Sequence, residues 1–286
     1  MWLGSVALAL ILVSAVIHAT WNLFAKRLPG GAEGVWLFTT ISAVAFAPFV
    51  AVVVFWSGYR PDGRDWLFLV GTGILQTFYF TVLRRGYATG DLSVVYPLAR
   101  GSGPLAAILL AVVLIGERPG PLTFAGAAII AAGAFLLATP FRGGGDHGAA
   151  ARVGLAIGLI IGVYTAWDGY AVGTLAIPAL VLIWFADAGR SLLLLPVAAR
   201  RKDSIRATWK SHRLEAASIG ILSTTSYLLV LVAMTIAPVS SIAPAREVSI
   251  VIGTLLGMLV LGEPVGPRRI IASVAIAAGV IVVALG

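Results

Sequence analysis

Two arginines and a glutamate lie deep inside apolar stretches of this sequence, where a charge is costly and usually faces a cavity or a partner. Arg100 lies about eight residues into one stretch, roughly 12 Å deep at a helical rise of 1.5 Å per residue. Arg246 lies at a similar depth in another stretch and is followed directly by Glu247. A guanidinium suits planar anions, so these residues predict a cavity that binds carboxylate or phosphate, with Glu247 available for an amine or a proton. Alternatively, each arginine is tied to a carbonyl or to Glu247 and holds the protein together.

Other titratable residues in apolar stretches are candidates for binding or relaying a proton. Asp168 and His18 join Glu247 in this set, and an imidazole titrates near neutral pH. The alternative roles are an interface carboxylate for Asp168 and a hydrogen-bonding packing residue for His18. Asp187 and Arg190 are three residues apart, which puts them on one helix face and predicts a self-neutralising ion pair.

Aromatic and amide side chains accompany these charged groups and could form walls for a substrate. Trp and Tyr also collect at membrane interfaces, so belts at the bilayer surface are the alternative. The predicted substrate-binding residues, besides Arg100, Arg246 and Glu247, are Tyr79, Tyr96, Trp21, Trp167, Tyr227 and Gln76. Glu117 and Glu263 stand in tight turns just before apolar segments. Each is expected to cap the helix that follows it.

Several kinds of chemistry lack their motifs in this sequence. It contains no cysteine, no HExxH, no Walker A sequence and no GxSxG. We therefore expect no enzyme activity, no cofactor and no metal site. The formal net charge is +8, but the basic residues stand mostly in short loops between apolar segments, as membrane topology requires. Nucleic acid is not an expected partner.

Composition places the whole chain in a lipid bilayer. Of its 286 residues 59% are hydrophobic and 11% are charged, with a mean hydropathy of +1.00. A membrane-spanning helix needs about 20 apolar residues, and long even apolar segments exclude barrel strands. The expected fold class is an all-α polytopic membrane protein with ten transmembrane helices. The predicted spans are 3–24, 34–56, 65–86, 92–115, 120–139, 152–173, 176–199, 214–236, 239–261 and 267–285.

The sequence repeats itself at one ungapped offset of 146 residues, which takes Arg100 to Arg246 and Trp21 to Trp167. The same offset joins Gly116 to Gly262, Glu117 to Glu263, Gly120 to Gly266, Pro121 to Pro267 and Gly133 to Gly279. We predict a first five-helix repeat over 1–140, a linker over 141–151 and a second repeat over 152–286. Because five is an odd number, the second repeat must insert upside down. Sites between inverted repeats lie near the bilayer midplane.

Loop charges predict the orientation of the chain. The loops after odd-numbered spans hold 14 Lys and Arg residues and those after even-numbered spans hold 3. Positive loops stay in the cytoplasm, so both termini are expected outside a plasma or bacterial inner membrane. Most of this bias comes from the segment 200–213. The sequence leaves monomer and homodimer open.

The motifs resemble those of the drug/metabolite transporter superfamily, EamA type. The first span ends in HATWN at 18–22, and each half has a Pro-then-Arg helix closing in a Gly-Glu turn, YPLARG to GERPG and APAREVS to GEPVG. The resemblance covers essentially the whole chain. It implies alternating access through a cavity lined mainly by helices 1, 3, 4, 6, 8 and 9. The expected function is secondary export of a small polar metabolite such as an amino acid, with protons as a candidate coupling ion. The alternative is a flippase for lipid-linked sugars or its accessory subunit.

Overall fold

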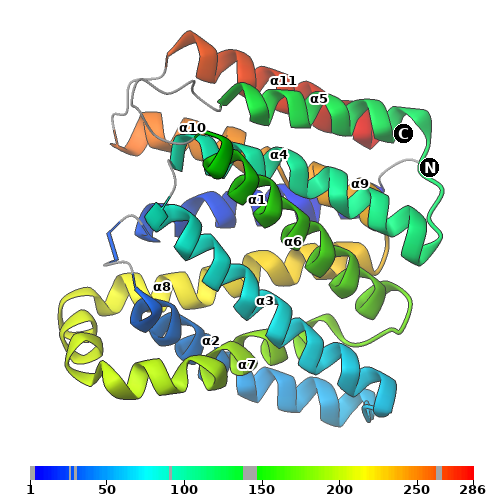
Figure 1. Cartoon of the computed structure of the whole chain (residues 1–286). Coiled ribbons are helices and arrows are strands. Elements are labelled where there is room, and N and C mark those ends of the chain that lie inside the picture. Colours follow the sequence, from blue (N-terminus) through cyan, green and yellow to red (C-terminus); the bar gives the residue numbers. More distant parts are fainter. Residues whose placement is uncertain (1–3, 26, 29–30, 90–91, 138–146, 262–265) are drawn as a thin grey trace.

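The chain folds into a bundle of long helices (Figure 1). The structure is a computed structural model that describes residues 4–25, 27–28, 31–89, 92–137, 147–261 and 266–286. This part of the chain contains helices and no strand. The elements are α1 (Ser5–Ala25), α2 (Ala32–Ser57), α3 (Gly63–Thr89), α4 (Leu92–Leu110) with a π-helical turn η1 (Ala111–Ile115), α5 (Pro121–Leu137), α6 (His147–Gly173), α7 (Ala179–Arg200), α8 (Lys202–Met234), α9 (Val239–Ala245), α10 (Val248–Leu261) and α11 (Pro267–Leu285).

The predicted all-α fold with ten spans is confirmed. In the described ranges nine helices are long and apolar enough to cross a membrane, counting the stretch Val239–Val260 as one. The remaining span is α5, an apolar helix of 17 residues. In lipid a helix satisfies its own backbone hydrogen bonds, which explains why apolar segments of this length fold in this way.

Two predicted boundaries were wrong. The basic segment 200–213 was expected to be a loop before a span beginning at 214, but α8 already begins at Lys202. His212 interrupts it with non-helical dihedral angles, φ −135° and ψ 34°. A polar helical segment therefore continues into the span through a bend. The helix α6 begins at His147, so the last residues of the predicted linker are helical.

The ninth span is broken in its middle, where a continuous helix was expected. After Pro244 the backbone N–H of Glu247 bonds to the Pro244 carbonyl, and that of Ile250 bonds to the Glu247 carbonyl, three residues back in each case. This tight turn separates α9 from α10 at Arg246 and Glu247. Discontinuous helices expose backbone and side-chain groups at the binding sites of many transporters, and here the break carries two charged side chains.

The helices pack with an internal two-fold symmetry that matches the sequence repeat. The equivalent helices α5 and α11 pack against each other, as do α2 and α7, and both termini lie at one end of the bundle (Figure 1). A Cβ on Gly126 would lie 2.7 Å from the Gly279 carbonyl oxygen, and a Cβ on Gly133 would lie 3.0 Å from that of Ala272. Since the repeat offset takes Gly126 to Ala272 and Gly133 to Gly279, these are two copies of one contact.

Glycines let α6 approach α4 closely. A Cβ on Gly154 would lie 3.0 Å from the Val95 carbonyl oxygen, and one on Gly158 would collide with the side chain of Ser102. Such small-residue stripes allow close helix packing in membranes. Because α4 carries Arg100 and α6 carries Asp168, this contact fixes the spacing of two predicted site residues.

The main apolar core fills one half of the bundle. Its buried members come from the N-terminal part of α1, the C-terminal ends of α6 and α8 and the start of α7, and include Ile11, Val172, Leu182 and Leu231. These segments lie toward the end of the molecule that carries both termini, which we call the terminal face. The opposite end carries the segment 200–213, and we call it the basic face.

Candidate functional site: a cavity between the repeats

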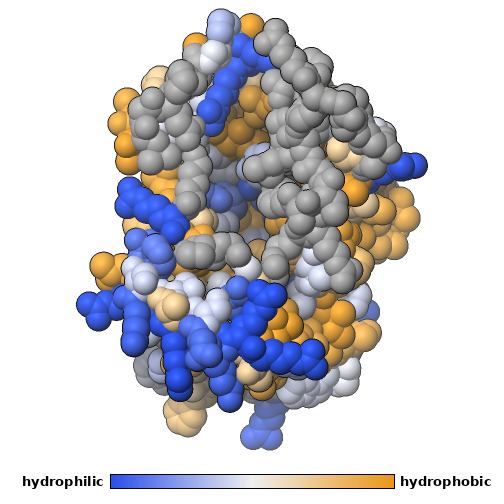
Figure 2. Space-filling view, turned by 60° about the vertical axis from the view of Figure 1, so that its left-hand side comes forward, coloured by the Kyte–Doolittle hydropathy of each residue, from blue (hydrophilic) through white to orange (hydrophobic). Residues whose placement is uncertain are grey.

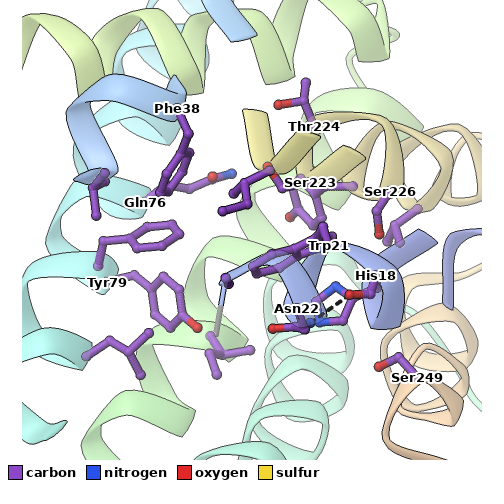
Figure 3. Close-up of a pocket in the computed structure, with 18 of the residues that line it drawn as sticks. His18, Trp21, Asn22, Phe38, Gln76, Tyr79, Ser223, Thr224, Ser226 and Ser249 are labelled. Carbon is purple, nitrogen blue, oxygen red and sulfur yellow. Dashed lines mark hydrogen bonds between the residues drawn. The ribbon is translucent and has the colours of Figure 1, made fainter. Parts of the chain in front are cut away.

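A cavity of about 620 Å³ occupies the half of the bundle that the main core leaves open. It is lined by α1–α4, α6–α8 and the α9–α10 break, so α2 and α7 contribute in addition to the six helices implied by the resemblance. Figure 3 shows His18, Trp21, Gln76 and Tyr79 turned toward this space. Its volume falls in the usual range for small-molecule sites, about 300–1,000 Å³.

The cavity extends toward the basic face. Its lining includes Leu28 and Gly31, which lie between α1 and α2 at that end of the bundle. The neighbouring Glu33, at the start of α2, pairs with Arg201 at 3.1 Å and so brings the 200–213 segment to the same face. Figure 2 shows hydrophilic side chains gathered over one part of the surface. The structure is thus hollow on the basic side and packed on the terminal side.

Arg100 is held by two neighbours on the cavity wall. Its Nη1 donates to Glu247 Oε1 at 3.3 Å, and its Nη2 lies 2.8 Å from His18 Nε2. A guanidinium can only donate, so His18 Nε2 is the acceptor and carries no proton in this contact. Glu247 is fully buried and does not itself line the cavity. Arg100 is therefore paired with Glu247, as expected for the alternative in which the arginine has a structural role and does not bind substrate.

Arg246 is held less completely, although it is the repeat partner of Arg100. Its Nε lies 3.6 Å from Glu247 Oε1 and makes no hydrogen bond. Its terminal nitrogens have no hydrogen-bond partner among the described residues, and the side chain lines the cavity. The break between α9 and α10 places this guanidinium beside the cavity. The two arginines, which the sequence could not distinguish, thus differ in the number of donors left for a ligand.

Aromatic rings form a continuous ladder along another wall. Phe38 and Phe80 have ring centroids 6.4 Å apart, Phe80 and Tyr79 are 5.2 Å apart, and Tyr79 and Tyr164 are 5.4 Å apart. Tyr227 follows at 6.2 Å from Tyr164. All five residues line the cavity. Such faces pack against apolar groups and attract cations, so the site offers both apolar and electrostatic contacts.

Asp168 lies behind this ladder, fully buried and outside the cavity lining. It accepts three hydrogen bonds from uncharged donors: Thr72 Oγ1 at 2.5 Å, Tyr227 Oη at 2.8 Å and Gln76 Nε2 at 3.0 Å. Each donor comes from α3 or α8, while Asp168 belongs to α6. Tyr227 and Gln76 also line the cavity, so this carboxylate reaches the cavity through their side chains.

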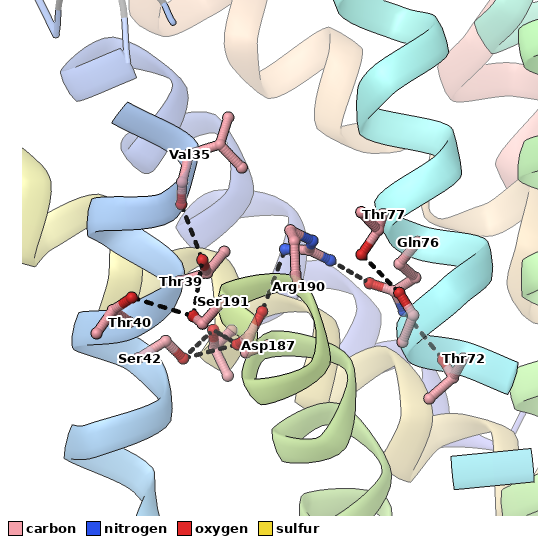
Figure 4. Close-up of polar contacts among 12 residues, drawn as sticks. Val35, Thr39, Thr40, Ser42, Thr72, Gln76, Thr77, Asp187, Arg190 and Ser191 are labelled. Carbon is pink, nitrogen blue, oxygen red and sulfur yellow. Dashed lines mark hydrogen bonds and ion pairs between the residues drawn. The ribbon is translucent and has the colours of Figure 1, made fainter. Parts of the chain in front are cut away.

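A chain of polar contacts connects Asp168 to the predicted pair Asp187 and Arg190. The pair is present, with Arg190 Nη1 at 3.2 Å from Asp187 Oδ1. Arg190 Nη2 also donates to Gln76 Oε1 at 2.7 Å (Figure 4). Gln76 Nε2 in turn donates to Asp168 Oδ2. Ser42 and Thr224 hydroxyls complete the partners of Asp187. The chain spans α7, α3 and α6, and it was not visible in the sequence.

Trp167 takes a different place from the one expected of a substrate-binding residue. It is not among the residues that line the cavity, whereas its repeat partner Trp21 is. Its ring stacks on Phe68 at 4.2 Å, and its Nε1 donates to the Phe68 carbonyl oxygen at 3.2 Å. Phe68 also stacks on Tyr170 at 5.4 Å. These rings fill the bundle on the terminal side of the cavity.

The remaining predicted residues and several unexpected ones line the cavity. Of the predicted set Arg100, Arg246, Tyr79, Tyr96, Trp21, Tyr227, Gln76 and His18 do so, and Tyr96 lies under the Arg100 guanidinium at 5.6 Å. Sequence reasoning missed Phe38, Phe80, Ser223, Thr224, Ser226 and Ser249. A single Ser or Thr in an apolar helix does not reveal from the sequence whether it faces the cavity or a neighbouring helix. The two phenylalanines look in the sequence like residues that face lipid.

Metal binding is not indicated in the described part of the chain, where no group of three or more His, Cys, Asp or Glu residues could hold an ion. Glu263, predicted to cap the last helix, lies outside the described residues.

Comparisons with known proteins agree with the fold and the repeat. The model of the EamA-like transporter family matches twice, over residues 5–139 and 150–285. A protein of Sinorhizobium sp., described as an uncharacterized transporter in cobO 3'region, is 35% identical over 105 residues, which cover 35% of this chain and 74% of that protein. A solved crystal structure matches with a TM-score of 0.76 and 21% identity over 96% of this chain and 95% of its own. The chain therefore belongs to the EamA-like transporter family and is a membrane transporter built of two EamA repeats.

Proposed function

We propose that this transporter exports a small metabolite with a carboxylate group, such as an amino acid, by alternating access. The observation that carries this proposal is the position of Arg246. Its terminal guanidinium nitrogens face a cavity of small-molecule size and have no partner among the described residues, while Arg100 is already occupied by Glu247 and His18. A planar guanidinium binds a carboxylate through two hydrogen bonds. Arg246 is therefore the substrate-anchoring residue, and Arg100 positions Glu247 beside it.

The aromatic ladder supports an organic substrate with an apolar part. Tyr79, Tyr164 and Tyr227 continue the row of rings from Phe80 and line the same cavity as Arg246. A ligand held at Arg246 would place its remaining atoms along these rings, where apolar groups lose contact with water. An ammonium group would also be stabilised on the ring faces. The site thus suits an amino acid better than an inorganic anion.

Alternating access is supported by the unequal packing of the repeat partners Trp167 and Trp21. Trp167 is bonded to Phe68 on the packed side, whereas Trp21 lines the open side and its Nε1 has no partner in the described structure. The offset that takes Trp21 to Trp167 takes Phe68 to Leu214. An exchange of conformations between the repeats would close the basic side by bonding Trp21 to the Leu214 carbonyl.

Export follows from the orientation that loop charge predicts. If the basic face is cytoplasmic, the cavity in this structure is open to the cytoplasm and loads substrate there. We therefore propose a multi-pass protein of the plasma or bacterial inner membrane with both termini outside. A reporter that is active only in the cytoplasm, fused at Gly286, should give no signal, and full signal would overturn this orientation.

A solute is favoured over a lipid-linked sugar. The cavity is lined by residues of α1–α4, α6–α8 and the α9–α10 break, and both Arg100 and Arg246 face it. A flippase would instead need an opening between two helices toward the lipid. We therefore do not propose the flippase function.

Transport in proteoliposomes tests the proposal. A panel of amino acids, amines and phosphates is offered with and without a pH gradient, and uptake of an amino acid is expected. Arg246→Gln should raise KM about tenfold or more, because a hydrogen bond to a charged group is lost. The variant should insert into the membrane normally. The matched control is Arg201→Gln, which removes an arginine paired with Glu33 outside the cavity. Uptake of no compound, or unchanged kinetics in Arg246→Gln, would contradict the proposal.

A further inference from the structure

The buried charges of the bundle balance in number but not in position. Three arginines and three carboxylates of the described chain are buried or line the cavity, namely Arg100, Arg190, Arg246, Asp168, Asp187 and Glu247. Asp187 and Arg190 neutralise each other at 3.2 Å. Glu247 is shared between Arg100 at 3.3 Å and Arg246 at 3.6 Å, so this cluster retains one positive charge. That charge faces the cavity through Arg246.

The carboxyl group of Asp168, when ionised, supplies the balancing negative charge at a separate place. Its three hydrogen-bond donors, Thr72, Gln76 and Tyr227, are all uncharged, and it forms no ion pair with the described residues. Arg246 nevertheless acts electrostatically on Asp168 and on Tyr227, which donates a hydrogen bond to Asp168. In a medium of low dielectric constant, such an interaction extends over several ångströms. An ionised Asp168 and Arg246 together make the six charges of the empty site sum to zero.

We propose that Asp168 takes up a proton when a net anionic substrate binds at Arg246, so that the acid and the proton occupy the transporter together. This inference rests on the proposed function. The substrate carboxylate removes the positive charge that compensates Asp168, and an uncompensated carboxylate inside a membrane protein is costly. Proton binding restores neutrality. The substrate and the proton therefore strengthen each other's binding by thermodynamic linkage.

The groups around Asp168 allow it to be either a carboxylate or a carboxylic acid. On α3 it faces Thr72 and Gln76, on α8 Tyr227, and at the α9–α10 break Arg246, while Arg190 of α7 acts through Gln76. The Thr72 and Tyr227 hydroxyls can each donate or accept, so one of them can turn to accept a hydrogen bond from the protonated carboxyl group. Tyr227 also lines the cavity and gives the proton a route to Asp168.

The other two candidates for proton coupling are less suited. His18 Nε2 accepts a hydrogen bond from Arg100 Nη2 at 2.8 Å, and protonation would place two cations in contact. Glu247 is held between Arg100 and Arg246, and its protonation would leave both of these uncompensated. Neither proton would offset the charge of an incoming acid as directly as one on Asp168.

The linkage distinguishes two substrate classes. A monocarboxylic acid brings one negative charge and should bind with one proton. An amino acid brings its own ammonium group, so its net charge is zero and no proton is required. For the acid, binding should strengthen as pH falls, by up to about tenfold per pH unit while Asp168 is ionised in the empty protein. For the amino acid, it should stay nearly constant.

The test compares leucine with 4-methylpentanoate, which has the same side chain and carboxylate but lacks the ammonium group. The full chain in detergent is mixed with each probe in weakly buffered solution that contains a pH indicator, and binding is measured in parallel by calorimetry. The wild type should take up close to one proton per bound 4-methylpentanoate and none per bound leucine. Asp168→Asn should take up none, and its affinity for the acid should be independent of pH.

The variants also separate linkage from simple damage. Because Asp168→Asn removes the negative charge that competes with the acid, it should bind 4-methylpentanoate at neutral pH at least as tightly as the wild type does. A misfolded variant would bind it more weakly. His18→Gln should keep the proton uptake per acid bound. Binding of the acid without proton uptake, or uptake lost in His18→Gln but kept in Asp168→Asn, would overturn the inference and leave the proposed function standing. Failure of both probes to bind would contradict the proposed function and this inference with it.

Discussion

Glu117 Oε1 accepts a hydrogen bond of 2.8 Å from the backbone N–H of Val239, which belongs to the other repeat. Its second oxygen accepts one of 2.9 Å from the N–H of Ser240. The carboxylate therefore caps the short helix α9 and not α5, the helix that follows it in sequence. The predicted cap was right in kind and wrong in partner. This cap fixes the start of α9, the helix that precedes Arg246, on the packed terminal side of the bundle.

Removing this cap should destabilise the protein and loosen the α9 segment. Glu117→Ala leaves two backbone N–H groups without acceptors, and we expect a loss of about 1–2 kcal/mol in the free energy of unfolding. Thermal unfolding in detergent measures it. The matched control is Glu33→Ala, whose partner Arg201 is 57% exposed, and which should change stability by less than about 1 kcal/mol. Equal effects of the two substitutions would show that the cap contributes nothing special.

Close packing of α6 on α4 predicts different results at two glycines. Gly158→Ala places a methyl group 3.1 Å from the Ala99 carbonyl oxygen and onto the Ser102 side chain, so we expect a loss of about 1–3 kcal/mol. Gly253→Ala, in the middle of α10, has Ala19 Cβ as its nearest neighbour at 4.0 Å. It should be neutral or stabilise by about 0.5–1 kcal/mol. Denaturation in detergent compares the two, and a tolerated alanine at Gly158 would contradict the observed approach.

The ion pair of Asp187 and Arg190 predicts strong coupling between two substitutions. Arg190→Met leaves a buried carboxylate without its cation and should cost about 3–5 kcal/mol. Adding Asp187→Leu should recover part of this loss because the uncompensated charge disappears. The interaction energy in the double-mutant cycle should be about 0.5–3 kcal/mol. Additive losses would mean that the two side chains act independently, despite their separation of 3.2 Å.

The unequal tryptophans predict which face opens. The chain has no cysteine, so pairs can be introduced without background. The pair Phe68→Cys with Trp167→Cys should react with a short bismaleimide at least about tenfold faster than the equivalent pair Leu214→Cys with Trp21→Cys, because only the first two residues are in contact. Linking the first pair should also stop transport, since the terminal side could no longer open. Faster linking of the second pair would place the opening on the other face.

Much of the fold could be read from local sequence. Apolar length fixed the number of spans, because a helix in lipid must be about 20 residues long. The offset that joins Arg100 to Arg246 revealed the repeat, and an odd number of spans made it inverted. The intrahelical pair of Asp187 and Arg190 was also predictable because residues three apart share a helix face. The break at Arg246 was not, although Pro244 stands beside it.

The candidate site was only partly predictable. The sequence selected Gln76, Asp168 and Tyr227 as single residues, but not the hydrogen bonds that unite them. It also treated Trp21 and Trp167 alike, whereas one lines the cavity and the other stacks on Phe68. The segment 202–211 was predicted to be a loop because its many charged residues give no apolar signal, although it is helical.

The sequence by itself determined the class of molecule, the two-repeat plan and the set of polar residues that must leave the lipid. These follow from hydrophobicity and chain length, which act along a single segment. Only the tertiary structure decided which partner each polar residue has. Glu117 accepts a hydrogen bond from Val239, and Arg100 forms an ion pair with Glu247, in both cases across the repeat boundary. Arg246 faces the cavity. Such contacts depend on how helices rotate and pack against one another. That packing is set by many small side-chain contacts at once, and no single segment records it.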